Sequence, residues 1–400
     1  MTAPSPSAAA VGAQRRMAWV DNIRWTVIIM VVLVHACVTY SGLGSWYYKE
    51  PRVLDIGAKL VFWMYGIFSQ AFFMGLLFFV AAAFVPASYD RKGFGRFVGE
   101  RALRLGVPAL VFMLVLDPIT STIASMGTGQ FVSWPAALAR YPGYIASGSF
   151  LGSTGPLWFA VALLVFSIVY AIARKGRSLV RGISSPKPRE ELTVSPKAVH
   201  AAAAVIMTVI AAGSFLVRLV QPVGTSWYNM QLCFFPSYIV LFFVGLWAGR
   251  RGLLAKLPRQ AGMVWLRLAF IIGVPAWFLL LGLGGALSGS EQAFVGGMHW
   301  QAAGYAAWEA FFCVAVSIGL VTLYREKANV RGRGTALLAD TSFGIYTFHA
   351  PILVGVSVLL RAFTLYPLAK AVLVAAIAFS VSLGFTWMVR KTPGLRKVFA

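Results

Sequence analysis

Long apolar runs recur along nearly the whole of this 400-residue chain, and many of them extend over eighteen residues or more. A run of that length is sufficient for a helix to cross the hydrocarbon core of a bilayer. Composition agrees, because 59% of the residues are hydrophobic and only 12% are charged, whereas soluble domains are about 45–50% apolar and about 25% charged. Transmembrane β-strands would instead give short alternating segments. The pattern predicts an all-α integral membrane protein.

We expect about ten transmembrane helices, near residues 22–41, 58–86, 102–124, 156–173, 199–220, 233–250, 263–286, 299–324, 340–362 and 367–389. The loops that follow even-numbered helices are rich in Lys and Arg, whereas the opposite loops hold few. Cytoplasmic loops carry such an excess of basic residues, so both termini are predicted to be cytoplasmic. This distribution explains the net charge of +23 and requires no nucleic-acid partner.

The ten predicted helices form a single transmembrane domain, residues 19–390. Residues 1–18 are rich in Ala, Pro and Ser, which is typical of a disordered tail, and we expect that tail to be cytoplasmic. Residues 391–400 are predicted to be a short basic cytoplasmic tail. The Pro- and charge-rich stretch 182–198 is the clearest linker, between the fourth and fifth spans.

The first span contains a cation and an imidazole, Arg24 and His35. Eleven residues are close to three helical turns, so both side chains lie on one face, about 16 Å apart along the axis. Asp21 can reach Arg24 from three residues earlier. Ionisable groups in a bilayer face protein or a water-filled cavity and mark a function. The alternative is a polar packing contact between helices.

Arg101 and Arg104 lie at the cytoplasmic mouth of the third span, three residues apart on one helix face. Paired guanidinium groups suit phosphate, which they can grip with two parallel hydrogen bonds. The alternative is that arginine at a cytoplasmic helix end serves membrane insertion and contacts lipid head groups.

A polar stripe occurs in the ninth span, where Ser342, Tyr346 and His349 share a face at positions i, i+4 and i+7. We place His349 at a depth in the membrane similar to that of His35. Two imidazoles at mid-membrane depth favour a functional site. The same Tyr–His pair also fits a contact that holds neighbouring helices in register.

Two acids inside spans, Asp117 and Glu309, are candidates to orient an imidazole by accepting its second N–H. Each also fits a hydrogen-bonded helix contact. Asp117 precedes Pro118, where a kink is expected, so the structural interpretation is favoured there and Glu309 is the better candidate. Four scattered histidines and few acids make no recognisable ligand set, so no metal site is predicted.

Four motifs, in this order, resemble those of the acyltransferase-3 superfamily of mostly bacterial integral-membrane O-acyltransferases with ten core spans. They are Arg24-x10-His35, Arg101-x-x-Arg104, Gly155-Pro156-Leu157-Trp158-Phe159, and Ser342-Phe343-Gly344-Ile345-Tyr346 with His349. The similarity covers essentially the whole chain and leans towards the branch that includes glucan-modifying, succinylating proteins. One position departs from the pattern, because many members have Ser-Gly where this chain has Ala81-Ala82-Ala83.

The resemblance implies transfer of an acyl group from cytoplasmic acyl-CoA to a hydroxyl of a sugar or another cell-surface acceptor. It implies a multi-pass protein of the cell inner (plasma) membrane, with acyl-CoA as co-substrate and no tightly bound cofactor. Catalysis would fall to His35 as general base, with Glu309 and His349. The CoA phosphates would be bound by Arg24, Arg101 and Arg104. Substrate-lining positions would be Asp21, Trp158, Ser342 and Tyr346.

A second function class fits a polytopic chain with polar residues in its spans, namely a secondary transporter or flippase for an anionic solute. That class favours inverted repeats and midplane polar residues in both halves. Here the polar residues cluster in the first, third, eighth and ninth spans without evident symmetry. Gradient-dependent uptake would identify a transporter, and acyl transfer would identify an enzyme.

Overall fold

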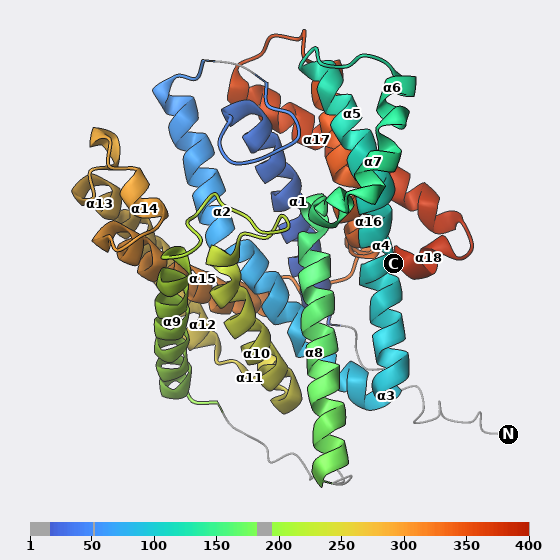
Figure 1. Ribbon diagram of the computed structural model, residues 1–400. Coiled ribbons are helices and arrows are strands. Elements are labelled where there is room, and N and C mark those ends of the chain that lie inside the picture. Colours follow the sequence, from blue (N-terminus) through green and yellow to red (C-terminus); the bar gives the residue numbers. More distant parts are fainter. Residues whose placement is uncertain (1–16, 51–52, 182–193, 400) are drawn as a thin grey trace, which may run out of the picture.

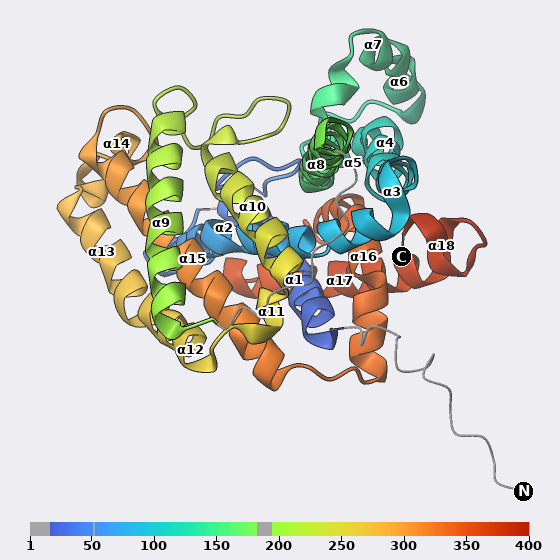
Figure 2. The same cartoon turned by 90° about the horizontal axis from the view of Figure 1, so that it is seen from below.

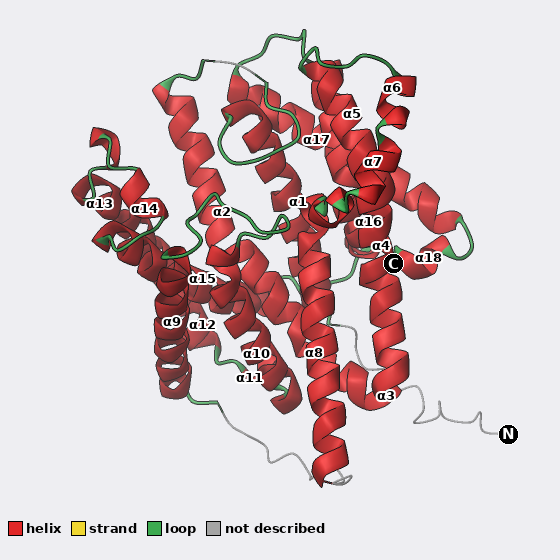
Figure 3. Ribbon diagram, in the orientation of Figure 1, coloured by secondary structure: helices red, strands yellow, loops and turns green. Residues whose placement is uncertain are grey.

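The computed structural model of the protein describes residues 17–50, 53–181 and 194–399. Most of the predicted tail 1–18 and most of the predicted linker 182–198 lie outside the described residues. Within them the chain is built from helices and loops and contains no strand, apart from one isolated bridge between Trp227 and Met230 (Figure 3). The predicted all-α class is confirmed.

Ten helices in the described part of the chain are long and apolar enough to cross a membrane, which confirms the predicted number (Figure 1). Seven of them are continuous: α1 Ala18–Ser41, α2 Ile56–Ala83, α8 Trp158–Arg181, α9 Pro196–Arg218, α15 Trp300–Lys327, α16 Arg333–Leu359 and α17 Pro367–Lys391. α10 Phe235–Arg251 follows a short 3-10 turn, η6 Leu232–Phe234. The other two are composite: Val85–Gly127 and Arg259–Leu283.

The composite segment Val85–Gly127 begins with α3 Val85–Arg101, which bends at Gly93. It continues through η2 Ala102–Gly106, α4 Val107–Val111, η3 Phe112–Leu116 and α5 Asp117–Gly127, where η2 and η3 are π-helical turns. A proline follows each π-turn closely, at Pro108 and Pro118. Proline lacks an N–H and its ring crowds the carbonyl four residues earlier, so the wider π-turn relieves both problems without ending the helix.

Short helices connect the spans. Between α5 and α8 the chain forms α6 Trp134–Ala139, α7 Tyr141–Ala146, η4 Ser149–Gly152 and η5 Gly155–Leu157. The segment Arg259–Leu283 consists of α12 Arg259–Leu268, η7 Ala269–Gly273 and α13 Val274–Leu283, preceded by α11 Leu253–Lys256 and followed by η8 Ala286–Ser288 and α14 Gln292–Val295. α18 Leu395–Val398 closes the chain. We call the end that carries α6 and α7 in Figure 1 the upper end.

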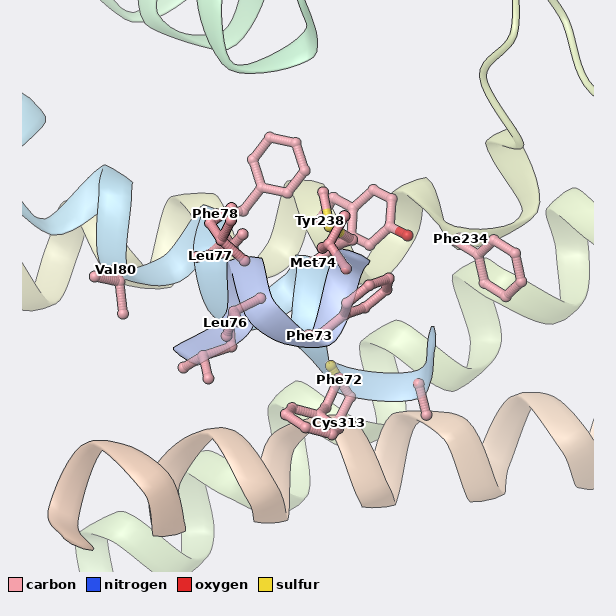
Figure 4. Packing of buried hydrophobic residues seen from close by; sticks show 14 of the residues in the cluster. Phe72, Phe73, Met74, Leu76, Leu77, Phe78, Val80, Phe234, Tyr238 and Cys313 are labelled. Carbon is pink, nitrogen blue, oxygen red and sulfur yellow. The ribbon is translucent and has the colours of Figure 1, made fainter. Parts of the chain in front are cut away.

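α2 forms the centre of the apolar core. Its run from Phe72 to Val80 packs against α10 and α15, and Figure 4 shows these side chains beside Tyr238 and Cys313. α10 approaches α2 closely, since a Cβ at Gly245 would lie 2.4 Å from the carbonyl oxygen of Phe79. Small residues four apart allow such backbone contact between membrane helices, and Gly249 extends it by one turn.

α1 lies inside the bundle, against α2, α15, α16 and α17 (Figures 1 and 2). α12 and α13 lie at the periphery, and the span they form has only 17% of its apolar window buried, against 72% for α15. Polar side chains of α1 therefore meet other helices rather than lipid. This arrangement places the first span, with its cation and imidazole, where it can contact the ninth.

Candidate active site

His35 of α1 and His349 of α16 meet in the interior of the bundle. His35 Nδ1 lies 2.9 Å from His349 Nε2, and the two rings are nearly parallel, with centroids 5.1 Å apart. His349 is fully buried, whereas His35 keeps part of its surface exposed. The sequence predicted two imidazoles at similar depth, and the structure joins them directly across 314 positions of the chain.

The hydrogen bonds define which nitrogen of each neutral ring carries a proton. His349 Nδ1 lies 2.8 Å from the carbonyl oxygen of Tyr346, and a carbonyl can only accept, so Nδ1 is the donor. In a neutral ring Nε2 of His349 then has the lone pair and accepts from Nδ1–H of His35. Nε2 of His35 is left with its own lone pair, which is the form that a general base requires.

A loop between α1 and α2 covers the His35 ring. The Trp46 indole stacks on the imidazole, with centroids 3.9 Å apart and planes 12° apart. Its Nε1 atom is buried and has no hydrogen-bond partner among the described residues. A buried unpaired donor costs about 1–3 kcal/mol, so this N–H is a candidate to bind a substrate atom.

The same loop is held in place by two polar contacts. The Tyr47 hydroxyl donates to Asp117 Oδ1 at 2.5 Å. The pKa of Tyr47 is raised, mainly because the side chain is buried and also because the Asp117 carboxylate lies next to it. Glu50 accepts from Lys370 Nζ through both carboxylate oxygens, at 2.9 Å each. Both members of that ion pair are buried. The loop position, and with it the indole, is therefore fixed by α5 and α17.

Tyr346 connects the ninth span to the start of the fourth. Its hydroxyl donates to the carbonyl oxygen of Pro156 in a buried hydrogen bond. Asn229 donates to the carbonyl oxygen of the neighbouring Gly155 at 2.8 Å. Trp158, two residues after Pro156 in the same motif, stacks on Tyr238 with centroids 5.6 Å apart. The motif that opens the fourth span thus helps to position the helix that carries His349.

Three arginines gather on the other side of the site. Arg24 and Arg104 are close enough to Arg101 for their charges to act on it. Arg24 Nη1 lies 3.4 Å from Asp21 Oδ1, as the spacing predicted, and its guanidinium lies over the Phe84 ring. α3, which ends at Arg101, lies at the lower end of the molecule (Figure 1). Three like charges held together are suited to a polyanion.

The structure does not bring Glu309 to the imidazoles. Among the described residues the partner of its carboxylate is the guanidinium of Arg218, at the end of α9. The two side chains are 2% and 0% exposed, and a buried carboxylate needs such a compensating charge. The Glu309 site is therefore a charged contact between α9 and α15, which differs from the orienting role that the sequence suggested.

The remaining candidates occupy different places. Ser342 donates to the carbonyl oxygen of Ala339 within its own helix, at 3.1 Å. Asp117 is joined to the site through Tyr47 and has more than a packing role at the kink. In the part of the chain that the structure describes, no three His, Cys, Asp or Glu side chains converge as a metal ion would need.

Sequence reasoning missed Trp46, Tyr47, Arg218 and Lys370. The two aromatic residues belong to the run Trp46-Tyr47-Tyr48 in a short loop, and such a concentration of aromatic side chains between two spans was a usable signal. Lys370 and Arg218 lie at or near the ends of apolar runs, where basic residues commonly serve topology. Only the fold shows that both are buried.

These features define a class: a multi-pass helical membrane protein with a paired-imidazole site in its interior and a cluster of arginines near the start of α1, the helix that carries His35. The acyltransferase-domain family Acyl_transf_3 matches residues 17–390. The chain belongs to this family, and the protein is a membrane acyltransferase that acts on an acyl donor and an acceptor. The comparisons with curated proteins and with solved structures found no match.

Proposed function

We propose that the protein transfers an acyl group from acyl-CoA to a hydroxyl of a sugar or another cell-surface acceptor, with His35 as general base. The observation that carries this proposal is the hydrogen-bonded series from His35 to His349 and to the Tyr346 carbonyl. It leaves Nε2 of His35, a residue that is only partly buried, as the basic atom. Family membership favours this enzyme over an anion transporter.

Donor binding is assigned to Arg24, Arg101 and Arg104. An acyl-CoA is a polyanion whose phosphates are separated from its thioester by a long arm, so its two ends need separate sites. Arg24 and His35 are about 16 Å apart along α1, which provides that separation. Basic loops support a cytoplasmic position for the arginines and for both termini, in the inner (plasma) membrane.

The reaction is a single acyl transfer. His35 Nε2 takes the proton of the acceptor hydroxyl as the oxygen attacks the thioester carbonyl. The carbon–oxygen bond of the new ester forms, and the carbon–sulfur bond breaks as the tetrahedral intermediate collapses. The leaving thiolate takes the proton back from the imidazolium, which gives free CoA thiol and restores the base. The chemistry requires no cofactor besides the co-substrate.

Negative charge develops on the carbonyl oxygen during this attack and requires a donor. Trp46 provides one, because its buried Nε1–H has no partner among the described residues and its ring stacks on His35. The indole is held by a loop that α5 and α17 fix in place. We therefore assign Trp46 to stabilise the oxyanion.

The test is release of free CoA thiol from acetyl-CoA by purified protein in liposomes, with succinyl-CoA and longer acyl-CoAs tried next. His35→Ala is expected to lower the rate by about 10²–10⁴-fold, the usual contribution of a general base. His200→Ala is the matched control, since His200 contacts Trp265 away from the site. Undiminished transfer by His35→Ala protein would disprove the mechanism.

A further inference from the structure

A cavity of about 290 Å³ is lined by residues of α5, of α6 and of α7. These three helices lie at the upper end of the molecule (Figure 1). This volume is at the low end of the range for small-molecule sites, about 300–1,000 Å³. α5 lines one side from Asp117 to Ser125, and residues 130–144 line the other. None of the three clustered arginines lines this cavity, and Arg101 and Arg104 precede its first lining residue, Asp117, on the same composite segment, so the cavity is separate from the assigned donor site.

Three polar side chains at this cavity are available to a ligand. Ser121, Gln130 and Arg140 line it, and no hydrogen bond or ion pair among the described residues engages their side chains. By contrast, other lining hydroxyls are already satisfied, such as those of Thr122 and Ser125, which donate to backbone carbonyls. The available groups comprise a hydroxyl, an amide and a guanidinium, which together donate and accept hydrogen bonds.

Aromatic rings form part of the cavity wall, and two of them are held rigidly. Tyr141 and Tyr144 donate to the carbonyl oxygens of Leu114 and Met113, at 2.8 and 2.6 Å. Those carbonyls belong to the π-turn η3. The hydroxyls thereby donate within the protein, and the rings, which also contact each other with centroids 6.0 Å apart, contribute apolar surface to the wall. An apolar wall beside a few convergent polar groups is the composition of a site for an amphipathic small molecule.

The cavity shares a wall with the active site. Asp117 lines it and accepts from Tyr47, and the residue before Tyr47, Trp46, stacks on His35. The rings of Tyr47 and Trp46 are in edge contact, with centroids 5.2 Å apart. The loop that carries Tyr47 and Trp46 therefore connects the cavity to the imidazole of His35, which the proposed reaction uses.

We propose that this cavity binds the polyhydroxylated part of the acceptor, a sugar unit that stacks on the tyrosine rings and hydrogen-bonds Ser121, Gln130 and Arg140. Its role as an acceptor site rests on the proposed function, whereas sugar binding itself does not. The lining is too polar for an acyl chain. The single cation, Arg140, admits either a neutral sugar or one that carries a carboxylate.

Thiol protection tests the binding directly. The native cysteines Cys37, Cys233 and Cys313 are buried, so Gln130→Cys introduces an exposed thiol that a polar maleimide can label. The protein is held in lipid nanodiscs, because detergents with sugar head groups would compete. Saturating cellobiose or glucuronate is expected to slow labelling by about tenfold, since only unoccupied protein reacts. Thr225→Cys, in an exposed loop distant in sequence, is the control and is expected to be unaffected.

Protection by cellobiose supports a neutral sugar site, and protection by glucuronate alone supports one that uses Arg140. Equal labelling with and without both sugars would overturn the proposal, whatever the enzyme does with acyl-CoA. Gln130→Cys replaces one of the side chains that we expect to bind the sugar. The measurement is therefore repeated with Ser133→Cys, which places a thiol at the same cavity and keeps the Gln130 amide.

A cavity-filling variant then tests the acceptor role. Ala137→Trp places an indole inside the cavity, whereas Leu138→Trp places one on the neighbouring residue, which is 69% exposed and outside the lining. Ala137→Trp is expected to abolish sugar protection and acyl transfer to sugar while slow thiol release to water continues. Transfer to sugar at the wild-type rate by Ala137→Trp protein would overturn the acceptor role. If the wild-type protein released no CoA thiol from any acyl-CoA, that result would instead count against the proposed function.

Discussion

Two buried polar pairs in this membrane protein solve the same problem in opposite ways. Arg218 and Glu309 are both charged and both excluded from solvent, and the Arg218 guanidinium also lies 4.4 Å from the Tyr305 ring centroid. His35 and His349 share one hydrogen bond between uncharged rings, and His35 keeps part of its surface exposed. The first pair balances its two charges within the protein, although Nε and Nη1 of Arg218 have no hydrogen-bond partner among the described residues. The second leaves one basic nitrogen available.

The difference shows what an ionisable residue in a span signifies. Burial alone did not separate the two pairs, because a carboxylate and an imidazole in apolar sequence both indicate an unusual environment. What separates them is the partner. An opposite charge makes a structural contact, whereas a ring oriented by another ring retains an atom that can accept a proton.

The largest expected effect is on stability at the charged pair. Arg218→Met leaves the Glu309 carboxylate buried without its counter-charge, which we expect to cost about 3–5 kcal/mol. The double variant Arg218→Met/Glu309→Met replaces both charges by apolar groups and is expected to recover most of that loss. Thermal unfolding in nanodiscs measures both. If Glu309→Gln abolished acyl transfer at unchanged stability, Glu309 would be catalytic, as the sequence suggested.

The next effect concerns the indole that covers the neutral pair. Trp46→Phe keeps an aromatic ring over His35 but removes the N–H, so we expect kcat to fall by about 10²-fold with little change in KM. Trp265→Phe is a matched control, because Trp265 Nε1 is also buried and unpartnered among the described residues. A fall of similar size in both variants would indicate a packing effect.

A smaller loss is expected at His349, to which we assign a positioning role because it is fully buried and hydrogen-bonds His35. His349→Ala removes one hydrogen bond, worth about 0.5–1.5 kcal/mol, and frees His35 to adopt either tautomer, so kcat should fall about tenfold. His349→Gln keeps an amide oxygen that can accept from His35 Nδ1 and should restore part of the rate. The pH–rate profiles of wild type and His349→Ala separate a positioning role from a purely structural one. If His349 served only the structure, the shape of the profile would be the same in both proteins.

The smallest effect on stability is expected at Asp55, a carboxylate that is exposed to water and therefore remains hydrated when it is charged. Asp55 accepts from the N–H of Ala58 at the start of α2 and from Tyr366, and these bonds hold the pKa of Asp55 below its ordinary value. The stability it contributes is present above the unfolded pKa of about 3.9 and is lost as the pH falls through the folded value.

Asp55→Ala should therefore lower the melting temperature slightly at neutral pH, and the difference from wild type should shrink on acidification. Asp55→Asn is the control, because asparagine also caps a helix and does not titrate. If the difference in melting temperature between Asp55→Ala and wild type did not shrink as the pH was lowered, the stabilising role of the Asp55 carboxylate would be contradicted.

The sequence predicted the helical class and the ten spans because length and hydropathy are local properties that the bilayer imposes on each segment. It also predicted that Arg24 and Asp21 would meet, since three residues on a helix are neighbours. These statements need no knowledge of how the helices pack.

The partners of buried groups could not be predicted in this way. His35 meets His349, and Glu309 meets Arg218, across 314 and 91 positions of the chain. Such pairings depend on which helix faces become adjacent, and an apolar pattern on every face gives little indication of that. The loop residue Trp46 was missed for a related reason, because its place over the imidazole is set by contacts with α5 and α17 that are distant in sequence.

α1 is a single unbroken helix from Ala18 to Ser41, and it carries both Arg24, one of the three arginines assigned to the phosphates, and the proposed base, His35. Their separation is therefore set by backbone geometry and not by any hinge between domains. One inserted residue between them would turn the imidazole by about 100° relative to the guanidinium. Four inserted residues would restore the direction to within about 40° but add about 6 Å. In the reaction that we propose, α1 thus sets the distance between the phosphates and the thioester of the donor, and it places no limit on the length of the acyl chain beyond the carbonyl.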